Sequence, residues 1–338
     1  MARNVIEYTD KGYINMRALL NKERLPYIWI TGARGCGKTY GAIDYLLHRP
    51  CMPFILMRRT KTQAEFAGSI DATPLKKNLR EGQELRDNPT KTKGLYRIDV
   101  LQDGELYNWV YVVGLSGVAS MRGIDLTQCD YVLYDEFIKE PHERPIRSEF
   151  LAWSNAMETF GRNRSLEGLP PLRMVALSNA LDLSNPYYEG LGIVDKVFRM
   201  IGDCWRDPSR GIAVYRPSST EFINRKKQTS LYKLNNATET LGNDWPTLDL
   251  SYVKTMSLKA ASPICRINDV IFFRVGSSIY ASATARPAGV PMYDLTDAVD
   301  RAAVHRERQP VISALFHRNV WFEDVGTLLK CRRLIDEL

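Results

Sequence analysis

The chain has 338 residues, of which 44% are hydrophobic and 25% charged, and its formal net charge is +7. This length suits one large domain or two modest ones, and the apolar fraction argues against a disordered chain. No apolar run reaches about 18 residues and the N-terminus lacks an apolar signal-peptide core, so we expect a cytosolic, soluble protein with no membrane partner. The six cysteines are scattered without a C-x-x-C pair, which favours reduced thiols over a zinc site.

A phosphate-binding loop is predicted near the N-terminus. A helix over residues 13–23 and a strand at Tyr27–Thr31 precede an octet that reads GARGCGKT and matches the G-x-x-x-x-G-K-[ST] pattern. A helix predicted over Lys38–Leu47 completes the strand–loop–helix context in which backbone N–H groups converge on a phosphate chain. The residues expected to contact ATP here are Gly32, Ala33, Arg34, Gly35, Cys36, Gly37, Lys38, Thr39 and Tyr40.

Individual residues of this loop have separate expected roles. Lys38 is a catalytic residue that reaches the β- and γ-phosphates, and the Thr39 hydroxyl is a ligand of Mg²⁺. Tyr40 is a candidate for stacking on adenine. A second apolar strand, over residues 53–60, ends in Arg58 and Arg59 at the same sheet edge. Either of these arginines, or Arg34, could contact the nucleotide of its own subunit.

An insertion follows the second strand. We expect a helical stretch near residues 61–80, a polar segment over 81–94, and a β-hairpin of Leu95–Val100 and Tyr107–Val113 around a turn at Asp103-Gly104. Lysines of the insertion could line a pore that grips the phosphates of DNA without reading its bases. These lysines are Lys61, Lys76, Lys77, Lys91 and Lys93.

The second half of a hydrolytic site is predicted at Asp135-Glu136. The pair follows Tyr131–Tyr134, a run suited to a buried parallel strand, and lies about ninety residues after the phosphate loop. Asp135 is expected to hold Mg²⁺, and Glu136 to orient and deprotonate the attacking water. The pair favours an ATPase of the additional-strand, catalytic-glutamate class over a kinase or a GTPase, and no N-K-x-D guanine pattern occurs.

The next elements continue an α/β alternation. A helix is expected around 146–161, and a strand over Leu172–Asn179 lies beside the strands already described, where Asn179 can sense the γ-phosphate. Turn residues at 207–211 and 216–219 mark a boundary. We therefore expect an ATPase domain over 1–204 with a mainly parallel sheet, a linker over 205–230, and a smaller α+β domain over 231–338.

The expected C-terminal domain combines an antiparallel meander with helices. Its strands are predicted at 264–267, 270–275 and 278–283, and its helices at 296–306 and 325–336. This order suits an RNase H-like fold, but Asp269 is the one acid within the meander, whereas a two-metal nuclease needs several. A vestigial nuclease domain without activity is the better interpretation.

Positive charge is concentrated in the same half. Residues 206–338 contain 19 Lys and Arg against 14 Asp and Glu, which accounts for five of the seven net charges. This excess indicates a polyanion partner. The clusters Arg225-Lys226-Lys227 and Arg332-Arg333 are candidate contacts.

Six motifs that follow one another over about residues 25–200 resemble those of a known protein family. They are ITGARGCGKT, FILMRRT, SMRGID, YVLYDEF, GRNR and VALSNA. Together they resemble the DNA encapsidation ATPases of small podophages, which are relatives of the large-terminase (RecA/terminase-like) motors. The resemblance implies ATP and Mg²⁺ as ligands and a homomeric, pentameric ring at the portal of an empty prohead. It also implies packaging RNA and double-stranded DNA as partners, and a protein of the host cytoplasm that is absent from the mature virion.

A trans-acting arginine is expected from the ring arrangement. In a ring ATPase a neighbouring subunit's cation neutralises charge on the transferring phosphoryl group. Arg162 and Arg164 are similar in placement to the family's trans-acting arginine, and Arg122 matches a second basic position. Arg147 is a further candidate.

Two other functions share these motifs. A helicase or another DNA-translocating ATPase of replication or conjugation would contain the same nucleotide site. A nucleotide switch would bind ATP without rapid turnover, but the predicted base Glu136 argues against it.

Overall fold

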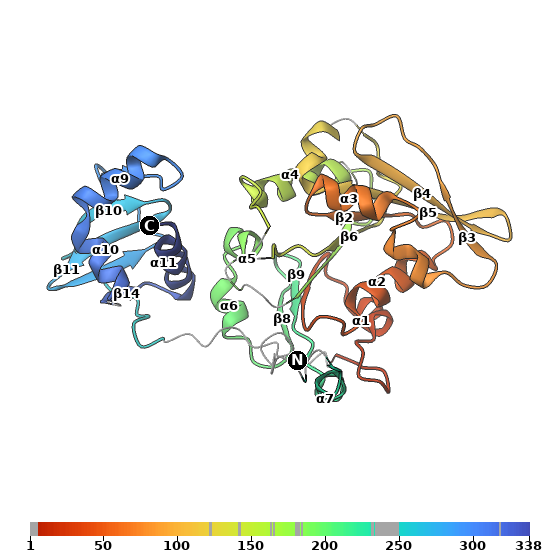
Figure 1. Cartoon of the computed structure of the whole chain (residues 1–338), viewed down its shortest axis with the longest axis horizontal. Helices are drawn as coiled ribbons and strands as arrows, with labels where there is room; N and C mark the ends of the chain where they lie inside the picture. The colour runs from red at the N-terminus through yellow and green to blue at the C-terminus, as the bar shows by residue number, and fades with distance from the viewer. Residues whose placement is uncertain are drawn as a thin grey trace. The chain divides into compact units, whose positions relative to one another are not determined.

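The computed structural model describes two compact units. Residues 1–182 and 200–245 form the first, and residues 183–199 and 246–338 form the second, so the chain enters the second unit, returns, and enters it again. Helices and strands of both units are labelled in Figure 1. The residues described are 6–121, 124–140, 143–162, 164, 166–179, 183, 185–230, 233, 250–317 and 319–338.

The first unit is built on a nine-stranded, mainly parallel sheet. Its strand order is β3-β4-β5-β2-β6-β7-β1-β9-β8, and the six strands from β5 to β9 are parallel to one another. Antiparallel pairs occur at both edges. The strands are β1 (Tyr27–Thr31), β2 (Phe54–Arg58), β3 (Gln83–Asp87), β4 (Leu95–Gln102), β5 (Glu105–Gly114), β6 (Tyr131–Asp135), β7 (Arg173–Ser178), β8 (Cys204–Asp207) and β9 (Ile212–Tyr215).

Helices cover both faces of this sheet, because its central strands are apolar on both sides. Side chains of α1 (Met16–Lys22), α2 (Lys38–Leu47) and α3 (Lys61–Gly68) form one cluster with the strand residues of one face. On the other face Trp29 of β1 packs against Trp153 of α4 (Glu149–Gly161), with ring centroids 5.5 Å apart. The predicted α/β class is confirmed.

The order of the central strands has a functional consequence. Strand β7 pairs with β1 and with β6, so an additional strand separates the strand before the phosphate loop from the strand that ends in Asp135. This is the arrangement expected for the additional-strand, catalytic-glutamate class. Because β1, β2, β6 and β7 are parallel, their carboxyl ends lie at one edge of the sheet.

The insertion differs in part from its prediction. The hairpin is present as β4 and β5, and both turn residues have positive φ (Asp103 +52°, Gly104 +86°), as a tight two-residue turn requires. The helix predicted over 61–80 ends at Gly68, and a short 3₁₀ helix η1 (Pro74–Asn78) follows. Proline is tolerated in the first turn of a helix but not in its interior. The polar segment contains strand β3.

The linker prediction does not fit the structure. Residues 205–230 contain most of β8, all of β9, and helix α7 (Thr220–Lys227). Strand β9 is fully buried and pairs in parallel with β1, so it belongs to the core of the first unit. The apolar run of β9 has only four residues and lies between two turn-rich segments. A run of this length is too short for its hydrophobic periodicity to distinguish a strand from a loop.

The second unit keeps the predicted order of strands and helices. Strands β10 (Ser262–Ile267), β11 (Val270–Val275) and β12 (Ser278–Ser282) form the antiparallel meander. Two short parallel strands, β13 (Met292–Tyr293) and β14 (Val320–Phe322), extend its two edges. The helices of this unit are α5 (Pro186–Gly190), α6 (Val194–Phe198), α9 (Ala298–Glu307), α10 (Gln309–Phe316) and α11 (Val325–Glu337).

Two features of the second unit were not predicted. Helices α5 and α6 come from the earlier part of the chain and pack with α11, where Arg333 pairs with Glu189 and the Val325 amide donates to Asp195 Oδ1 at 3.0 Å. Asp269, in the turn between β10 and β11, pairs with Lys330.

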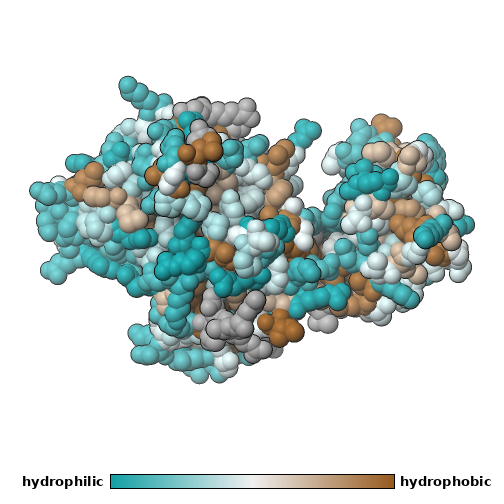
Figure 2. All heavy atoms as spheres, turned by 180° about the vertical axis from the view of Figure 1, so that it is seen from behind, coloured by the Kyte–Doolittle hydropathy of each residue, from teal (hydrophilic) through white to brown (hydrophobic). Residues whose placement is uncertain are grey.

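Figure 2 shows that hydrophilic residues cover most of the face displayed. Among the described helices, none has the length and apolar character needed to cross a bilayer.

Candidate nucleotide site

The phosphate loop lies where the sequence predicted, between the carboxyl end of β1 and the amino end of α2. The loop is tied to the neighbouring strand because the Gly32 amide donates to the Ser178 carbonyl at 3.1 Å. Gly35 and Gly37 have φ of +84° and +94°, a region that disfavours any residue with a Cβ. Successive amides in such a turn form a concavity that binds anions.

Lys38 is folded into the loop. Its side chain is buried, and its ammonium donates to the carbonyls of Gly32 (2.7 Å) and Ala33 (2.9 Å). Burial lowers the pKa of Lys38, and this effect is opposed by the Cys36 thiol and the Asp135 carboxylate. The ammonium therefore lies within the turn that would receive a phosphate, which fits the predicted role.

Thr39 and Asp135 meet across the site. Thr39 Oγ1 donates to Asp135 Oδ1 at 2.9 Å, although 96 residues separate them in the sequence. Hydroxyl and carboxylate oxygens are the ligands that Mg²⁺ prefers, and at nucleotide sites this ion takes one or two protein oxygens in addition to phosphate oxygens. No cluster of three or more His, Cys, Asp or Glu occurs among the residues described, and such a site does not need one. These two residues fit Mg²⁺.

Arg58 joins the two acids that follow β6. Its guanidinium pairs with Asp135 and lies 3.2 Å from Glu136 Oε2. Glu136 has φ of +59°, a left-handed conformation that costs roughly 1–2 kcal/mol for a residue with a Cβ. The Glu136 side chain is 48% exposed and projects from the carboxyl edge of the sheet. Arg58 therefore lies in the predicted site of its own subunit.

The pKa of Glu136 is raised above its ordinary value. Loss of hydration is the largest cause, the charges of Asp135 and Glu140 act in the same direction, and Arg58 opposes them. A carboxylate with a raised pKa is a stronger proton acceptor, which suits a general base.

Arg59 does not belong to the site. It is completely buried and makes a two-point contact with Glu149, with Nε–Oε1 of 2.8 Å and Nη2–Oε2 of 3.1 Å, and its Nη1 lies 2.7 Å from Glu143 Oε2. Successive residues of a strand point to opposite faces, so Arg58 and Arg59 cannot both face Asp135. The candidate role of Arg59 at the nucleotide was wrong, and this arginine instead fixes the start of α4.

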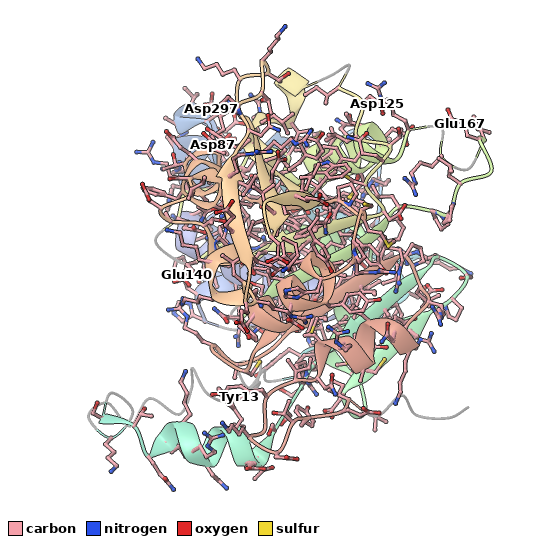
Figure 3. The ribbon with its side chains drawn as sticks, turned by 90° about the vertical axis from the view of Figure 1, so that its right-hand side faces the viewer. Tyr13, Asp87, Asp125, Glu140, Glu167 and Asp297 are labelled. Atoms are coloured by element: carbon pink, nitrogen blue, oxygen red, sulfur yellow. The ribbon has the colours of Figure 1, made fainter. Side chains whose placement is uncertain are left out.

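The other predicted contacts lie on the same edge. Arg34 is largely exposed and pairs with Glu140, which is labelled in Figure 3. Tyr40 is 57% exposed on the first turn of α2, and Asn179 directly follows Ser178 at the end of β7. Contacts of Tyr40 and Asn179 with a nucleotide stay predictions.

Comparison with known proteins now identifies the family. Residues 9–251 match the family described as podovirus DNA encapsidation protein (Gp16). The chain belongs to this family. The DNA packaging proteins of Bacillus phages PZA and phi29 are each 27% identical to it over 235 residues. That alignment covers 67% of this chain and 63% of each relative, so the chain matches less than two thirds of their length.

Solved structures of this kind share the fold over nearly the whole chain. The Phi-28 gp11 DNA packaging motor superposes with a TM-score of 0.59 over 97% of this chain and 98% of that one, at 15% identity. The bacteriophage Phi-29 viral genome packaging motor assembly gives a TM-score of 0.59 over 96% and 99%, at 19% identity. The fold of both units is therefore that of the packaging motors.

The predicted trans-acting arginines of this encapsidation protein have different environments. Arg164 is buried, pairs with Asp130, and donates to the carbonyls of Cys129 (3.2 Å) and Pro170 (2.9 Å). An arginine that is bound on all sides within its own subunit is not available to a neighbour. The prediction for Arg164 was wrong, and its role is to hold the loop before β6.

Arg162 is exposed and lies far from its own phosphate loop. It lines a hollow with Pro26 and Tyr27, at the amino end of β1, whereas the loop follows the carboxyl end. Five strand residues separate the two ends by about 15 Å. Arg162 also has a strained backbone, with φ of +33°. The trans role of Arg162 stays a prediction, as does that of Arg147, which is exposed before α4. Arg122 lies outside the described residues.

The sequence did not indicate what packs on the outside of the loop. Phe222 of α7 forms a buried cluster with Ala33 and Cys36, and the Ile14 amide donates to the Cys36 carbonyl at 3.0 Å. The basic cluster at Arg225-Lys226-Lys227 was predicted only as a polyanion contact. Its position beside the loop depends on long-range packing that no local pattern encodes.

Proposed function

We propose that this chain hydrolyses ATP to ADP and phosphate with Mg²⁺ and uses the reaction to move double-stranded viral DNA into a preformed prohead. The observation that carries the hydrolytic part is the cluster at the sheet edge. Thr39 contacts Asp135, Arg58 bridges Asp135 and Glu136, and Lys38 lies in the adjoining phosphate loop. Membership of the encapsidation family supports the link to DNA packaging.

The residues have distinct roles in this proposal. The loop amides and Lys38 hold the phosphate chain, and Glu136 accepts a proton from water as its oxygen attacks the γ-phosphorus and the bond to the ADP oxygen breaks. Bound Mg²⁺, held by Thr39 and Asp135, would neutralise charge on the β- and γ-phosphates. The raised pKa of Glu136 favours turnover over a switch that only binds nucleotide.

The proposed partners follow from the relatives. The similar phage proteins are named DNA packaging proteins, and the similar structures are packaging motors. We propose that this chain also assembles as a pentameric ring on the prohead portal, with packaging RNA where the phage supplies it. It would act in the host cytoplasm and leave before the virion matures. The insertion lysines Lys61, Lys76, Lys77, Lys91 and Lys93 are all exposed, as DNA contacts require.

Two substitutions test the hydrolytic site. Lys38→Ala removes the ammonium from the phosphate loop, so it is expected to weaken ATP binding and abolish turnover. Glu136→Gln removes the base but keeps the size and shape of the side chain. This variant is therefore expected to bind ATP with Mg²⁺ while its turnover falls about 10²–10⁴-fold. Phosphate release and binding of a fluorescent ATP analogue measure the two effects.

Lys196→Ala, an exposed change on α6, is the matched control and should behave as wild type. Wild-type turnover in Glu136→Gln would show that Glu136 is not the base. ATP-dependent entry of DNA into proheads, measured as protection from nuclease, tests the packaging function itself.

A further inference from the structure

The outer face of the phosphate loop is covered by α7 and by residues 9–14. Phe222 of α7 packs on Ala33 and Cys36, and its ring lies 5.7 Å from that of Tyr13. Tyr13 in turn packs against Gly37, where an added Cβ would lie 3.3 Å from the Tyr13 Cβ. Figure 3 shows Tyr13 above this helix. Two segments from distant parts of the chain therefore support the loop from behind.

Lys226 makes a polar contact within this support. Its ammonium donates to the Arg34 carbonyl at 3.0 Å and lies 5.6 Å from the centre of the Phe222 ring. The contact depends on Gly35, because a Cβ added there would lie 2.7 Å from the Lys226 ammonium. Gly35 occupies a variable position of the loop pattern, and besides allowing a φ of +84° its lack of a Cβ also admits this lysine.

The geometry of the peptide bond gives these contacts a consequence. A trans peptide is planar, so a carbonyl and the N–H of the next residue point in opposite directions. Lys226 holds the Arg34 carbonyl toward α7, and the Ile14 amide holds the Cys36 carbonyl on the same support. The N–H groups of Gly35 and Gly37 are therefore directed to the other side of the loop, where a phosphate chain would be bound.

We propose that Lys226 is a positioning residue for the nucleotide phosphates. It fixes the peptide between Arg34 and Gly35 so that the Gly35 N–H is already directed at the phosphate before the nucleotide arrives. Lys226 acts through the backbone of the loop and makes no direct contact with the phosphates in this role. The inference rests on the proposed function, because it takes ATP as the ligand of the loop.

Two variants and a neighbouring control test this role. Lys226→Met removes the ammonium and keeps most of the stem, and we expect affinity for a fluorescent ATP analogue to fall about tenfold, as for the loss of one charged hydrogen bond. Because the same peptide is used before and during the reaction, KM should rise more than kcat falls. Lys226→Arg keeps a donor and should stay within about threefold of wild type, and Lys11→Met, which neutralises an exposed lysine of the segment 9–14, should match wild type.

The possible outcomes separate this role from others. If Lys226→Met binds ATP as tightly as Lys11→Met, the inference is wrong, whereas the proposed function is unaffected. If Lys226→Arg loses as much affinity as Lys226→Met, with both variants folded at the assay temperature by thermal unfolding, the side chain matters only for packing and the inference again fails. If wild type binds ATP but does not hydrolyse it, the proposed function fails, and a tenfold loss of binding confined to Lys226→Met still supports the inference.

Discussion

Glu136 is subject to two opposed influences. Loss of hydration and neighbouring carboxylates raise its pKa, and the Arg58 guanidinium, 3.2 Å away, lowers it. The same guanidinium pairs with Asp135, so one cation contacts both the base and the expected Mg²⁺ ligand. The left-handed backbone at Glu136 holds the side chain at the edge where the two influences meet.

This arrangement predicts a pH effect of Arg58→Ala. Removal of the Arg58 cation leaves only the smaller effect of Arg34 against the raising influences, so the pKa of Glu136 increases further. Turnover requires the deprotonated base and is lost as pH falls through that pKa. The acid limb of the kcat profile should therefore lie at higher pH in Arg58→Ala than in wild type.

Arg58→Lys retains a positive charge and is the matched control, so its acid limb should stay close to that of wild type. Steady-state phosphate release over a pH series measures both variants. An acid limb in Arg58→Ala at or below the wild-type position would mean that Glu136 is not the titrating base.

At the scale of elements, helix α4 is fixed at both ends by arginines. At its start Arg59 is completely buried against Glu149. Beyond its end Arg164 donates to Pro170 and to three residues around the entry to β6, namely Thr127, Cys129 and Asp130. Between these ends Trp153 packs on Trp29 of β1. The helix that leads to the exposed Arg162 is therefore held rigidly on the sheet.

We expect Arg164→Ala to destabilise the first unit. Its side chain is buried, so truncation leaves the carbonyls of Cys129 and Pro170 without this donor. The loss should be about 2–3 kcal/mol, less than for a fully buried ion pair because the Asp130 side chain is 41% exposed. Urea unfolding measures the free energy. Arg162→Ala, two residues earlier and exposed, should change it by less than about 0.5 kcal/mol, and equal losses in both variants would contradict this account.

The sequence predicted the parts of the site that are encoded locally. The strand, glycine turn and helix around Gly32–Thr39 form one continuous pattern, and the acids Asp135 and Glu136 end a recognisable apolar strand. Local patterns do not say which of two adjacent arginines faces a distant acid, because that depends on strand pleat and burial. For the same reason the sequence alone did not show that Arg58 and not Arg59 contacts Asp135, or that Arg162 is exposed whereas Arg164 is buried. The support of the loop by α7 likewise depends on contacts across about 190 residues.

At the scale of the whole molecule, the two halves of the predicted catalytic machinery lie at opposite ends of one strand. Lys38, Thr39 and Glu136 are at the carboxyl edge of the sheet, and Arg162 is exposed at the amino edge beside Tyr27. A separation of about 15 Å along β1 exceeds the reach of an arginine side chain. If Arg162 acts in catalysis, it must therefore act on the nucleotide of another subunit.

This separation predicts complementation between two inactive variants. Arg162→Ala leaves the subunit's own Lys38 and Glu136 intact, so it should bind ATP normally and lose turnover about 10³–10⁵-fold in the assembled ring. Glu136→Gln subunits lack the base but retain Arg162. In a mixed ring some Glu136→Gln subunits place an intact Arg162 beside the intact site of an Arg162→Ala neighbour, and ATPase activity should return at those interfaces. Arg164→Ala subunits should not complement in this way, because Arg164 is buried within its own subunit.

ATPase activity is measured on proheads, where rings assemble, and at protein concentrations too low for assembly, where the activity should be absent. Mixtures that stay inactive on proheads, while wild type hydrolyses ATP there, would show that Arg162 is not the trans-acting arginine, and complementation by Arg122→Ala subunits would assign that role to Arg122.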